Sequence, residues 1–176
     1  LGAFGHTGPW KNRPGYEPII QAVAGLVSLN GDPSGPEARI GVSIIDLSTG
    51  MWTAIGILAA LRYRDATGQG QQIDIGMLDT HLAWLANQGM NYLYSGQLPQ
   101  RMGNAHPNTV PYQDFPTADG HMILAIGNDG QFAKFCAAAG HAEWASDARF
   151  ATNAARVTHR QALIPLIQAV TQTRNT

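Results

Sequence analysis

The chain has 176 residues, of which 44% are apolar, and its formal net charge is -1. A chain of this length can bury a real core and can form one domain or parts of two. Lysine and arginine are scattered singly, which argues against nucleic acid or an anionic membrane as a partner. No apolar run approaches the roughly 18 residues of a membrane span and no signal peptide is recognisable, so we expect a globular cytoplasmic protein.

The sequence gives little support for metal binding or for a reactive thiol. The six histidines form no i, i+4 pair beside a glutamate and have no cysteine partners at metal-binding spacing, so we expect no metal site. The single cysteine, Cys136, cannot close an internal disulfide, and its apolar helical surroundings predict a packing role. The G-x-S-x-G elbow of many serine hydrolases is absent from the sequence.

The first elements are expected in the order loop, helix, strand. Residues 2–15 are rich in turn formers and predict a loop. Residues 18–29 have apolar side chains at helical spacing and are followed by Asn30-Gly31, which predicts one helix. The short apolar run 39–45 predicts a strand that leads directly to Asp46.

Two long helices are expected next, with a strand between them. Residues 48–65 have the apolar spacing of a helix, and Gly68 is placed to cap its end. Residues 72–78 alternate between apolar and polar side chains as a strand does. Asp79 is expected to cap a second long helix over residues 80–94.

A change of composition marks residues 96–109, which are polar and turn-rich enough for a linker or an active-site loop. Beyond it, residues 110–128 predict two strands joined by a turn at 118–120. Residues 131–140 and 156–170 predict helices, the second interrupted by Pro165.

Asp46 allows two interpretations. Aspartate is a preferred N-cap residue, because its carboxylate accepts hydrogen bonds from the first N–H groups of a helix. The junction of a strand end with a helix start is also where α/β proteins place ligands and reacting groups. The two roles are compatible, and local pattern by itself favours the cap.

Seven ordered sequence blocks resemble the class III CoA-transferases, the CaiB/BaiF or formyl-CoA transferase type. Members of that family are much longer, so the resemblance implies that this chain is a fragment from the middle of a longer protein. The blocks cover practically the whole chain and are GAFGHTGP (2–9), RPGYE (13–17), DLSTGM (46–51), GILAAL (56–61), TGQGQQIDI (67–75), GNAHPN (103–108) and FPTADG (115–120).

The resemblance implies an α/β fold in which a Rossmann-like large domain with a parallel sheet is joined to a smaller α+β domain. Two subunits of such a protein interlock as a homodimer. Residues 1–95 would then be a large-domain segment carrying the nucleophile, 96–109 a linker or active-site loop, and 110–176 a small-domain segment.

The resemblance also assigns the nucleophile to Asp46. A carboxylate with a reference pKa of about 3.9 is ionised at neutral pH and can attack a thioester without a general base. The expected intermediates are an aspartyl anhydride and an aspartyl-CoA thioester, through which CoA moves from an acyl-CoA to a carboxylic acid. We expect no tightly bound cofactor, because the coenzyme A thioester is itself a substrate.

Further site residues follow from the same blocks. Tyr16 and Glu17 are placed close to CoA and the nucleophile, with an aromatic core contact and a helix N-cap as their structural alternatives. Gly50 and Gly103 are candidate oxyanion donors, with turn chemistry as the alternative. Asn104, in the same block as Gly103, is a candidate CoA-binding residue.

Two other functions remain open. Family members that racemise α-methylacyl-CoA carry a histidine where this chain has Tyr16, so the tyrosine argues against an acyl-CoA racemase or isomerase. The chain is alternatively a truncated, non-catalytic interaction module. The segment 101–108 replaces the longer glycine-rich loop of the formyl-CoA transferase branch, so formyl or oxalyl specificity is not implied, and a dicarboxylic donor such as succinyl-CoA is one candidate.

Overall fold

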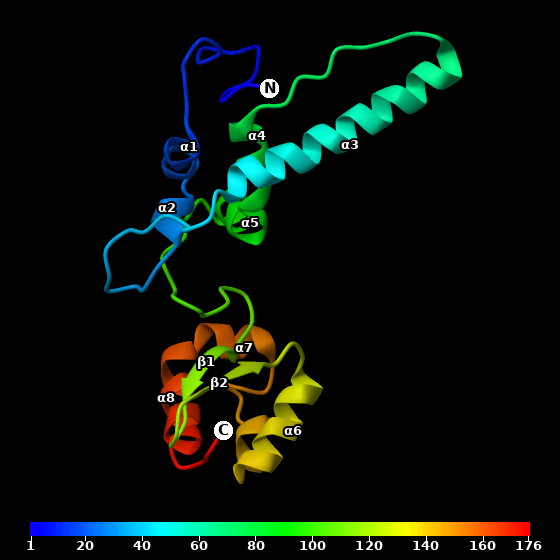
Figure 1. The fold of residues 1–176 in the computed structure, drawn as a ribbon. Helices are drawn as coiled ribbons and strands as arrows, with labels where there is room; N and C mark the ends of the chain where they lie inside the picture. The colour runs from blue at the N-terminus through cyan, green and yellow to red at the C-terminus, as the bar shows by residue number, and fades with distance from the viewer. The chain divides into compact units, whose positions relative to one another are not determined.

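The computed structural model describes all of residues 1–176, which divide into two compact units, Leu1–Arg101 and Met102–Thr176 (Figure 1). The division lies inside the segment 96–109 that the sequence marks as a linker or loop. The assignment of the two units to a large and a small domain stays a prediction. Each unit is described by itself.

Residues 17–29 form two short helices where the sequence predicted one. Helix α1 covers Glu17–Val23 and helix α2 covers Leu26–Leu29. Gly25, between them, has φ 93°, a left-handed conformation that glycine adopts without strain. The chain therefore turns at Gly25, and the apolar spacing alone did not indicate this break.

Helix α3, Ile44–Thr67, is the longest element of the chain, with 24 residues. It ends at Gly68, whose φ is 72° and whose N–H donates to the Arg64 carbonyl oxygen at 2.7 Å, so the predicted C-cap is confirmed. Its start lies earlier than predicted. The expected strand 39–45 is wrong, because its last two residues already belong to α3 and the rest find no neighbouring strand.

The predicted parallel sheet is reduced here to one isolated bridge between Gly2 and Gly76. Gly2 donates to the Ile75 carbonyl oxygen at 3.2 Å, and Met77 donates to the Gly2 carbonyl oxygen at 2.9 Å. A strand needs a partner along its length, and residues 72–76 meet only the start of the chain. Within these 176 residues only this bridge of the expected Rossmann-like parallel sheet is formed, and the first unit is otherwise helical.

Residues 77–95 form two helices where one was expected. Helix α4 covers Met77–Trp84 and helix α5 covers Ala86–Ser95. The break lies at Ala86, whose φ is 44°. The N-cap position of α4 is held by Gly76, so the expectation that Asp79 caps this helix is also wrong.

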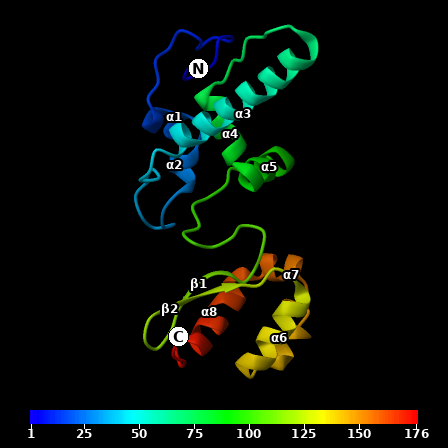
Figure 2. The same ribbon diagram turned by 45° about the vertical axis from the view of Figure 1, so that its right-hand side comes forward.

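The first unit buries few apolar side chains. Its buried apolar residues are Ile20, Ala24 and Ile45, where α1, α3 and α4 meet. The second half of α3 has only the returning segment 68–76 beside it (Figures 1 and 2). Large apolar side chains along α3 consequently remain exposed: Leu47, Met51, Trp52, Ile55, Ile57, Leu58, Leu61 and Tyr63.

Helix α3 also corrects the expectation that no segment resembles a membrane span. Its best 18-residue window has a mean hydropathy of 1.6, and only 17% of that window is buried, so by length and composition it is the one helix that meets the criteria for a span. The core helix of a soluble protein meets the same criteria. Helix α3 therefore presents a long apolar surface that has no cover within this chain.

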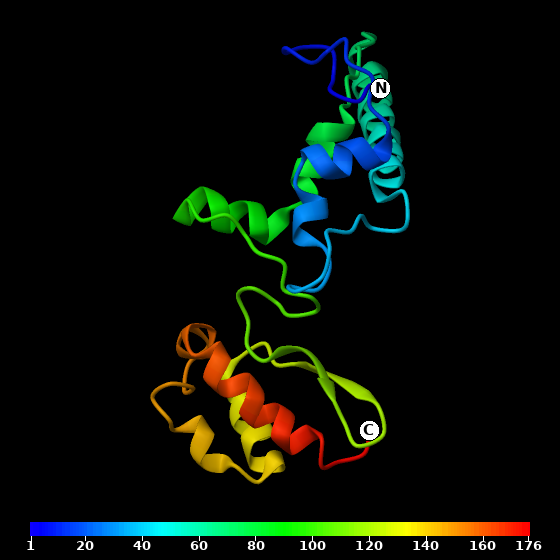
Figure 3. The same cartoon turned by 90° about the vertical axis from the view of Figure 1, so that its left-hand side faces the viewer.

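The second unit is built on an antiparallel hairpin of β1, Tyr112–Pro116, and β2, His121–Ala125, as predicted. The register pairs Tyr112 with Ala125 and Pro116 with His121. Helices cover one face of this hairpin, where Phe115 is buried, whereas Ile123 is exposed (Figure 3).

The remaining elements of the second unit are helical. They are α6 (Asp129–Ala139), the 3₁₀ helix η1 (Ala142–Ala145), α7 (Asn153–Thr158) and α8 (Arg160–Thr171). The sequence predicted a helix interrupted at Pro165, but the break falls at His159 and Pro165 lies inside α8.

One continuous core holds the second unit together. Cys136 is fully buried in it, which confirms its packing role, and burial raises the pKa of its thiol. Arg156 is fully buried beside this core and donates to the carbonyl oxygens of Val110 and Phe150 and to Asp129 Oδ1. The apolar members of the core are Val110, Phe115, Ile126, Phe132, Cys136, Trp144, Phe150, Leu163 and Ile167.

Candidate active site

Asp46 is the third residue of α3 and lies on the exposed side of its first turn. Ser43 occupies the N-cap position, and the Asp46 carboxylate takes part in no hydrogen bond or ion pair in the structure. The interpretation of Asp46 as the N-cap is therefore wrong. A charged side chain without a hydrogen bond or ion pair is free to act on a ligand.

Two backbone N–H groups in the same turn as this carboxylate have no hydrogen-bond acceptor. Ile44 and Leu47 donate to the carbonyl oxygens of Val42 and Ser43, whereas the N–H groups of Ile45 and Asp46 have no acceptor. Free N–H groups at a helix start carry partial positive charge and attract anions. Because Ile45 is fully buried, only the Asp46 N–H is open to a ligand, and the first turn of α3 joins a free carboxylate to one accessible donor.

The buried side of the same turn anchors it. Ser48 and Thr49 are buried and donate from their hydroxyls to the carbonyl oxygens of Ile44 and Ile45, at 2.7 and 2.6 Å. Gly50, one turn beyond Asp46, is exposed with no atom within 4 Å of the position that a Cβ would take. Its N–H lies inside the helix, where the backbone ladder uses it. Gly50 therefore offers open space beside Asp46 rather than a free donor.

Tyr16 and Glu17 are neighbours with opposite exposure. Tyr16 is the N-cap residue of α1 and is 81% exposed, so the alternative of an aromatic core contact is wrong. Glu17 is 4% exposed and is the first residue of α1 rather than its N-cap. Of the two, only Tyr16 presents its side chain to a ligand in this chain.

A series of buried hydrogen bonds links Glu17 to the segment before α3. Gln21 is fully buried and donates from Nε2 to Glu17 Oε1 at 2.5 Å. The same amide accepts from the Ile40 N–H at 2.9 Å and donates to the Ile40 carbonyl oxygen at 3.3 Å. Gln21 therefore binds α1 to the segment that precedes Asp46.

His81, on α4, lies beside these linked polar groups and was not singled out from the sequence. It is fully buried, and neither ring nitrogen has a hydrogen-bond partner; Glu17 Oε2 is likewise buried without one. Burial lowers the pKa of His81, and the nearby Glu17 charge acts in the opposite direction. Only tertiary contacts bring Glu17 and His81 together, so sequence spacing carried no signal for the pair.

Gly103 and Asn104 belong to the second unit. They are exposed and occupy the middle of a turn that is closed by the Ala105 N–H donating to the Met102 carbonyl oxygen at 3.0 Å. Gly103 has φ 57°, so its glycine satisfies the turn. Their expected role at the site of Asp46 stays a prediction.

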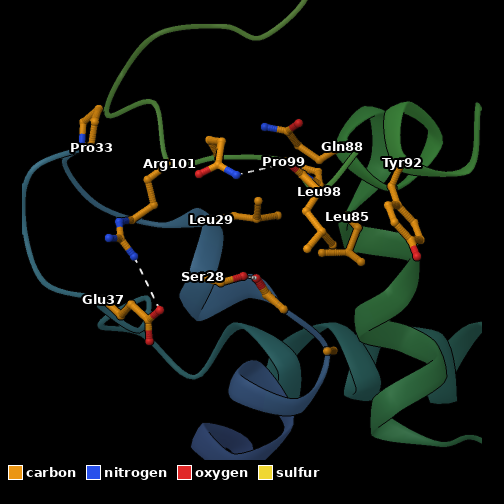
Figure 4. A pocket seen from close by; sticks show the side chains of 14 residues that line it. Ser28, Leu29, Pro33, Glu37, Leu85, Gln88, Tyr92, Leu98, Pro99 and Arg101 are labelled. Atoms are coloured by element: carbon orange, nitrogen blue, oxygen red, sulfur yellow. Dashed lines mark hydrogen bonds and ion pairs between the residues drawn. The ribbon is translucent and has the colours of Figure 1, made fainter. Parts of the chain in front are cut away.

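A cavity of the first unit, about 570 Å³, lies apart from these residues, between α2 and α5 (Figure 4). Arg101 reaches into it, 3.6 Å from Glu37 Oε1, and also donates to the carbonyl oxygens of Asp32 and Gly35. Because these contacts occupy the guanidinium, the cavity presents mainly apolar surface with a neutralised charge. Neither Asp46 nor Tyr16 lines it.

The whole chain, residues 1–176, matches the model of CoA-transferase family III, and the protein belongs to that family. It is 47% identical over 168 residues to the succinate–glutarate CoA-transferase of Agrobacterium fabrum, covering 96% of this chain and 42% of that enzyme. It is 38% identical to the acetyl-CoA:oxalate CoA-transferase of Acetobacter aceti, covering 91% and 41%.

Solved structures agree with this assignment. A CaiB/BaiF family protein from Brucella suis is 48% identical and superposes with a TM-score of 0.74, covering 99% of this chain and 46% of that one. Rv3272 from Mycobacterium tuberculosis is 26% identical with a TM-score of 0.82, covering 98% and 44%. The chain thus spans less than half the length of the relatives that it matches.

Proposed function

We propose that the full-length protein containing this chain transfers CoA from an acyl-CoA thioester to a carboxylic acid, with Asp46 as the nucleophile. The observation that carries the proposal is the exposed, unpaired Asp46 carboxylate at the start of α3, where the N–H group of the same residue has no acceptor. The family membership of the chain supports the same reaction class.

In the first half-reaction the Asp46 carboxylate attacks the thioester carbonyl, and the C–S bond breaks to give an anhydride and CoA thiolate. The thiolate then attacks the aspartyl carbonyl and releases the first carboxylate, leaving an aspartyl-CoA thioester. Each tetrahedral intermediate carries an oxyanion, which the free N–H group of the exposed Asp46 is suited to stabilise. One such donor is typically worth about 3 kcal/mol.

The second half-reaction reverses these steps with a new carboxylic acid. The incoming carboxylate attacks the aspartyl thioester, CoA thiolate leaves, and the thiolate then takes the new acyl group from the mixed anhydride. Asp46 returns to its carboxylate form, and no metal or redox step enters. The interlocked homodimer and the cytoplasmic location are further parts of this proposal.

For substrates we propose short dicarboxylates, with succinyl-CoA as the donor and glutarate as an acceptor. The support is the 47% identity to an enzyme named succinate–glutarate CoA-transferase. Because the chain spans 42% of that enzyme, residues outside it also contribute to acid selection in this proposal.

Covalent trapping tests the role of Asp46. The full-length protein is incubated with succinyl-CoA and then with hydroxylamine, which should convert Asp46 to a hydroxamate detectable by peptide mass. Asp46→Asn should abolish both the adduct and transfer to glutarate, because an amide is a far poorer nucleophile. Asp65→Asn, which changes an exposed carboxylate near the other end of α3, is the matched control and should keep both.

Two results would contradict the proposal. Transfer by Asp46→Asn at the wild-type rate without deamidation would remove Asp46 from the mechanism. A hydroxamate on another residue, with Asp46 unmodified, would place the nucleophile elsewhere.

A further inference from the structure

Three buried polar atoms in the first unit lack partners, and they belong to only two residues, Glu17 and His81. A buried donor or acceptor without a partner is costly, and native proteins nearly always satisfy such groups. Glu17 Oε2 can only accept a hydrogen bond as a carboxylate, and a neutral imidazole has one N–H to donate. A ring N–H of His81 could therefore be the donor that Glu17 Oε2 lacks, and Glu17 Oε2 the acceptor that this N–H lacks.

The surroundings offer no competing partner for His81. Helices α1 and α4 pack against each other, and Glu17 is the one charge that acts on the imidazole. The neighbouring Thr80 hydroxyl donates to the Gly76 carbonyl oxygen at 3.0 Å and makes no hydrogen bond with the His81 ring. The other Glu17 oxygen is held by Gln21, which leaves Oε2 as the free atom.

We propose that His81 is a positioning residue that donates a ring N–H to Glu17 Oε2, and that the pair holds the start of α3 through Gln21. The resulting chain of contacts is His81, Glu17, Gln21 and the backbone of Ile40, which precedes Asp46 by six residues. His81 touches no substrate. It sets the position of the residues that carry the nucleophile, and this effect on catalysis rests on the proposed CoA-transfer function.

Steady-state kinetics of the full-length protein test whether His81 affects catalysis. His81→Leu removes the donor at similar volume and should lower kcat about 10- to 100-fold, the size expected from a small misplacement of a reacting group. The KM for acyl-CoA should stay within about twofold, because no substrate contact is lost. His81→Asn and His81→Gln place an amide N–H near the Nδ1 and Nε2 positions, so one of them should recover most of the rate.

Thr80→Val is the matched control. It changes a buried polar side chain of the same helix outside the chain of contacts, and its kcat should stay within about twofold of wild type. Wild-type kcat in His81→Leu would overturn the positioning role. Equal loss in His81→Leu, His81→Asn and His81→Gln would do the same.

A spectrum tests the pair independently of any measurement of catalysis. Histidine labelled with ¹⁵N gives ring signals, and that of His81 is assigned by its loss in His81→Gln. We expect a slowly exchanging ring N–H whose signal shifts in Glu17→Gln. A His81 signal that is unchanged in Glu17→Gln would overturn the pairing. A wild-type protein that transfers no CoA would end the proposed function, while this spectrum would still decide on the pair.

Discussion

Arg156 shows how one charged side chain can organise a core. Its guanidinium is fully buried, lies 4.3 Å from the centre of the Phe132 ring, and donates to two carbonyl oxygens and one carboxylate. The planar guanidinium donates from three separate nitrogens to these three acceptors, whereas the three N–H groups of a lysine ammonium share one nitrogen and cannot reach the same three positions. Arg156, on α7, therefore joins the segments that precede β1 and α7 to the start of α6 by polar contacts around an apolar centre.

We expect Arg156→Lys to lower the free energy of unfolding of the second unit by about 2–4 kcal/mol, because buried acceptors lose their donors. Arg149→Lys is the control, since Arg149 binds Asp147 on the surface and holds the pKa of that carboxyl at about 2. Chemical denaturation followed by the fluorescence of Trp144 compares the two variants. Equal midpoints for Arg156→Lys and Arg149→Lys would contradict the structural role of Arg156.

At the site, the sequence indicated the residue whose chemistry is most specific and missed those that support it. Asp46 stands in a recognisable block, so it could be proposed as the nucleophile although its local structure was predicted wrongly. Gln21 and His81 fit the pattern of ordinary helical residues, and their importance comes from contacts across 19 residues and between helices. Contacts of this kind leave no periodic signal in the sequence.

At the scale of elements, glycine at a helix end has a measurable role in α3. Gly68 adopts φ 72°, a region in which a Cβ meets the following carbonyl, so Gly68→Ala should lower stability by about 1–2 kcal/mol. Gly70→Ala is the matched control, because Gly70 has no positive φ and no atom within 4 Å of the added Cβ. Urea unfolding of the full-length protein measures both.

Equal stability of Gly68→Ala and Gly70→Ala would contradict the importance of the cap. A loss confined to Gly70→Ala would assign the strain to the loop after α3 instead.

The elements predicted well are those that carry their own signals. The hairpin has a turn between alternating strands, and the end of α3 has its glycine, so both were predicted correctly. The strand 39–45 failed because a strand depends on a neighbour that sequence order does not supply, and the Gln21 amide satisfies the Ile40 backbone instead. The breaks at Gly25 and Ala86 interrupt apolar spacing that continues on both sides, so periodicity alone could not reveal them.

At the scale of the whole molecule, the two units differ sharply in what they bury. All nine members of the continuous apolar core belong to Met102–Thr176. Of the large exposed apolar side chains, only Tyr112, Ile123 and Leu166 lie in that unit, and the others lie in Leu1–Arg101. The first unit thus exposes an apolar surface of the kind that proteins usually bury against another part of the structure.

We therefore expect Leu1–Arg101 expressed alone, and the 176-residue chain itself, to self-associate, because extended apolar surface drives association. Met102–Thr176 alone is the control and should be monomeric with a cooperative thermal transition. Sedimentation velocity at several concentrations measures the difference. A monomeric Leu1–Arg101 with a sharp melt would show that its apolar surface needs no cover.

The exposed face of α3 has a calorimetric consequence. The heat capacity of unfolding is set by the apolar area that is newly wetted, and it averages about 12–15 cal/mol/K per residue in ordinary domains. Along α3, water already reaches side chains such as Met51, Leu58 and Ile55 before unfolding begins. Unfolding of monomeric Leu1–Arg101, at concentrations too low for self-association, should therefore have a smaller heat capacity change per residue than unfolding of Met102–Thr176. The stability of the monomeric unit should change only weakly with temperature, whereas burying that face in the full-length protein would restore the usual curvature.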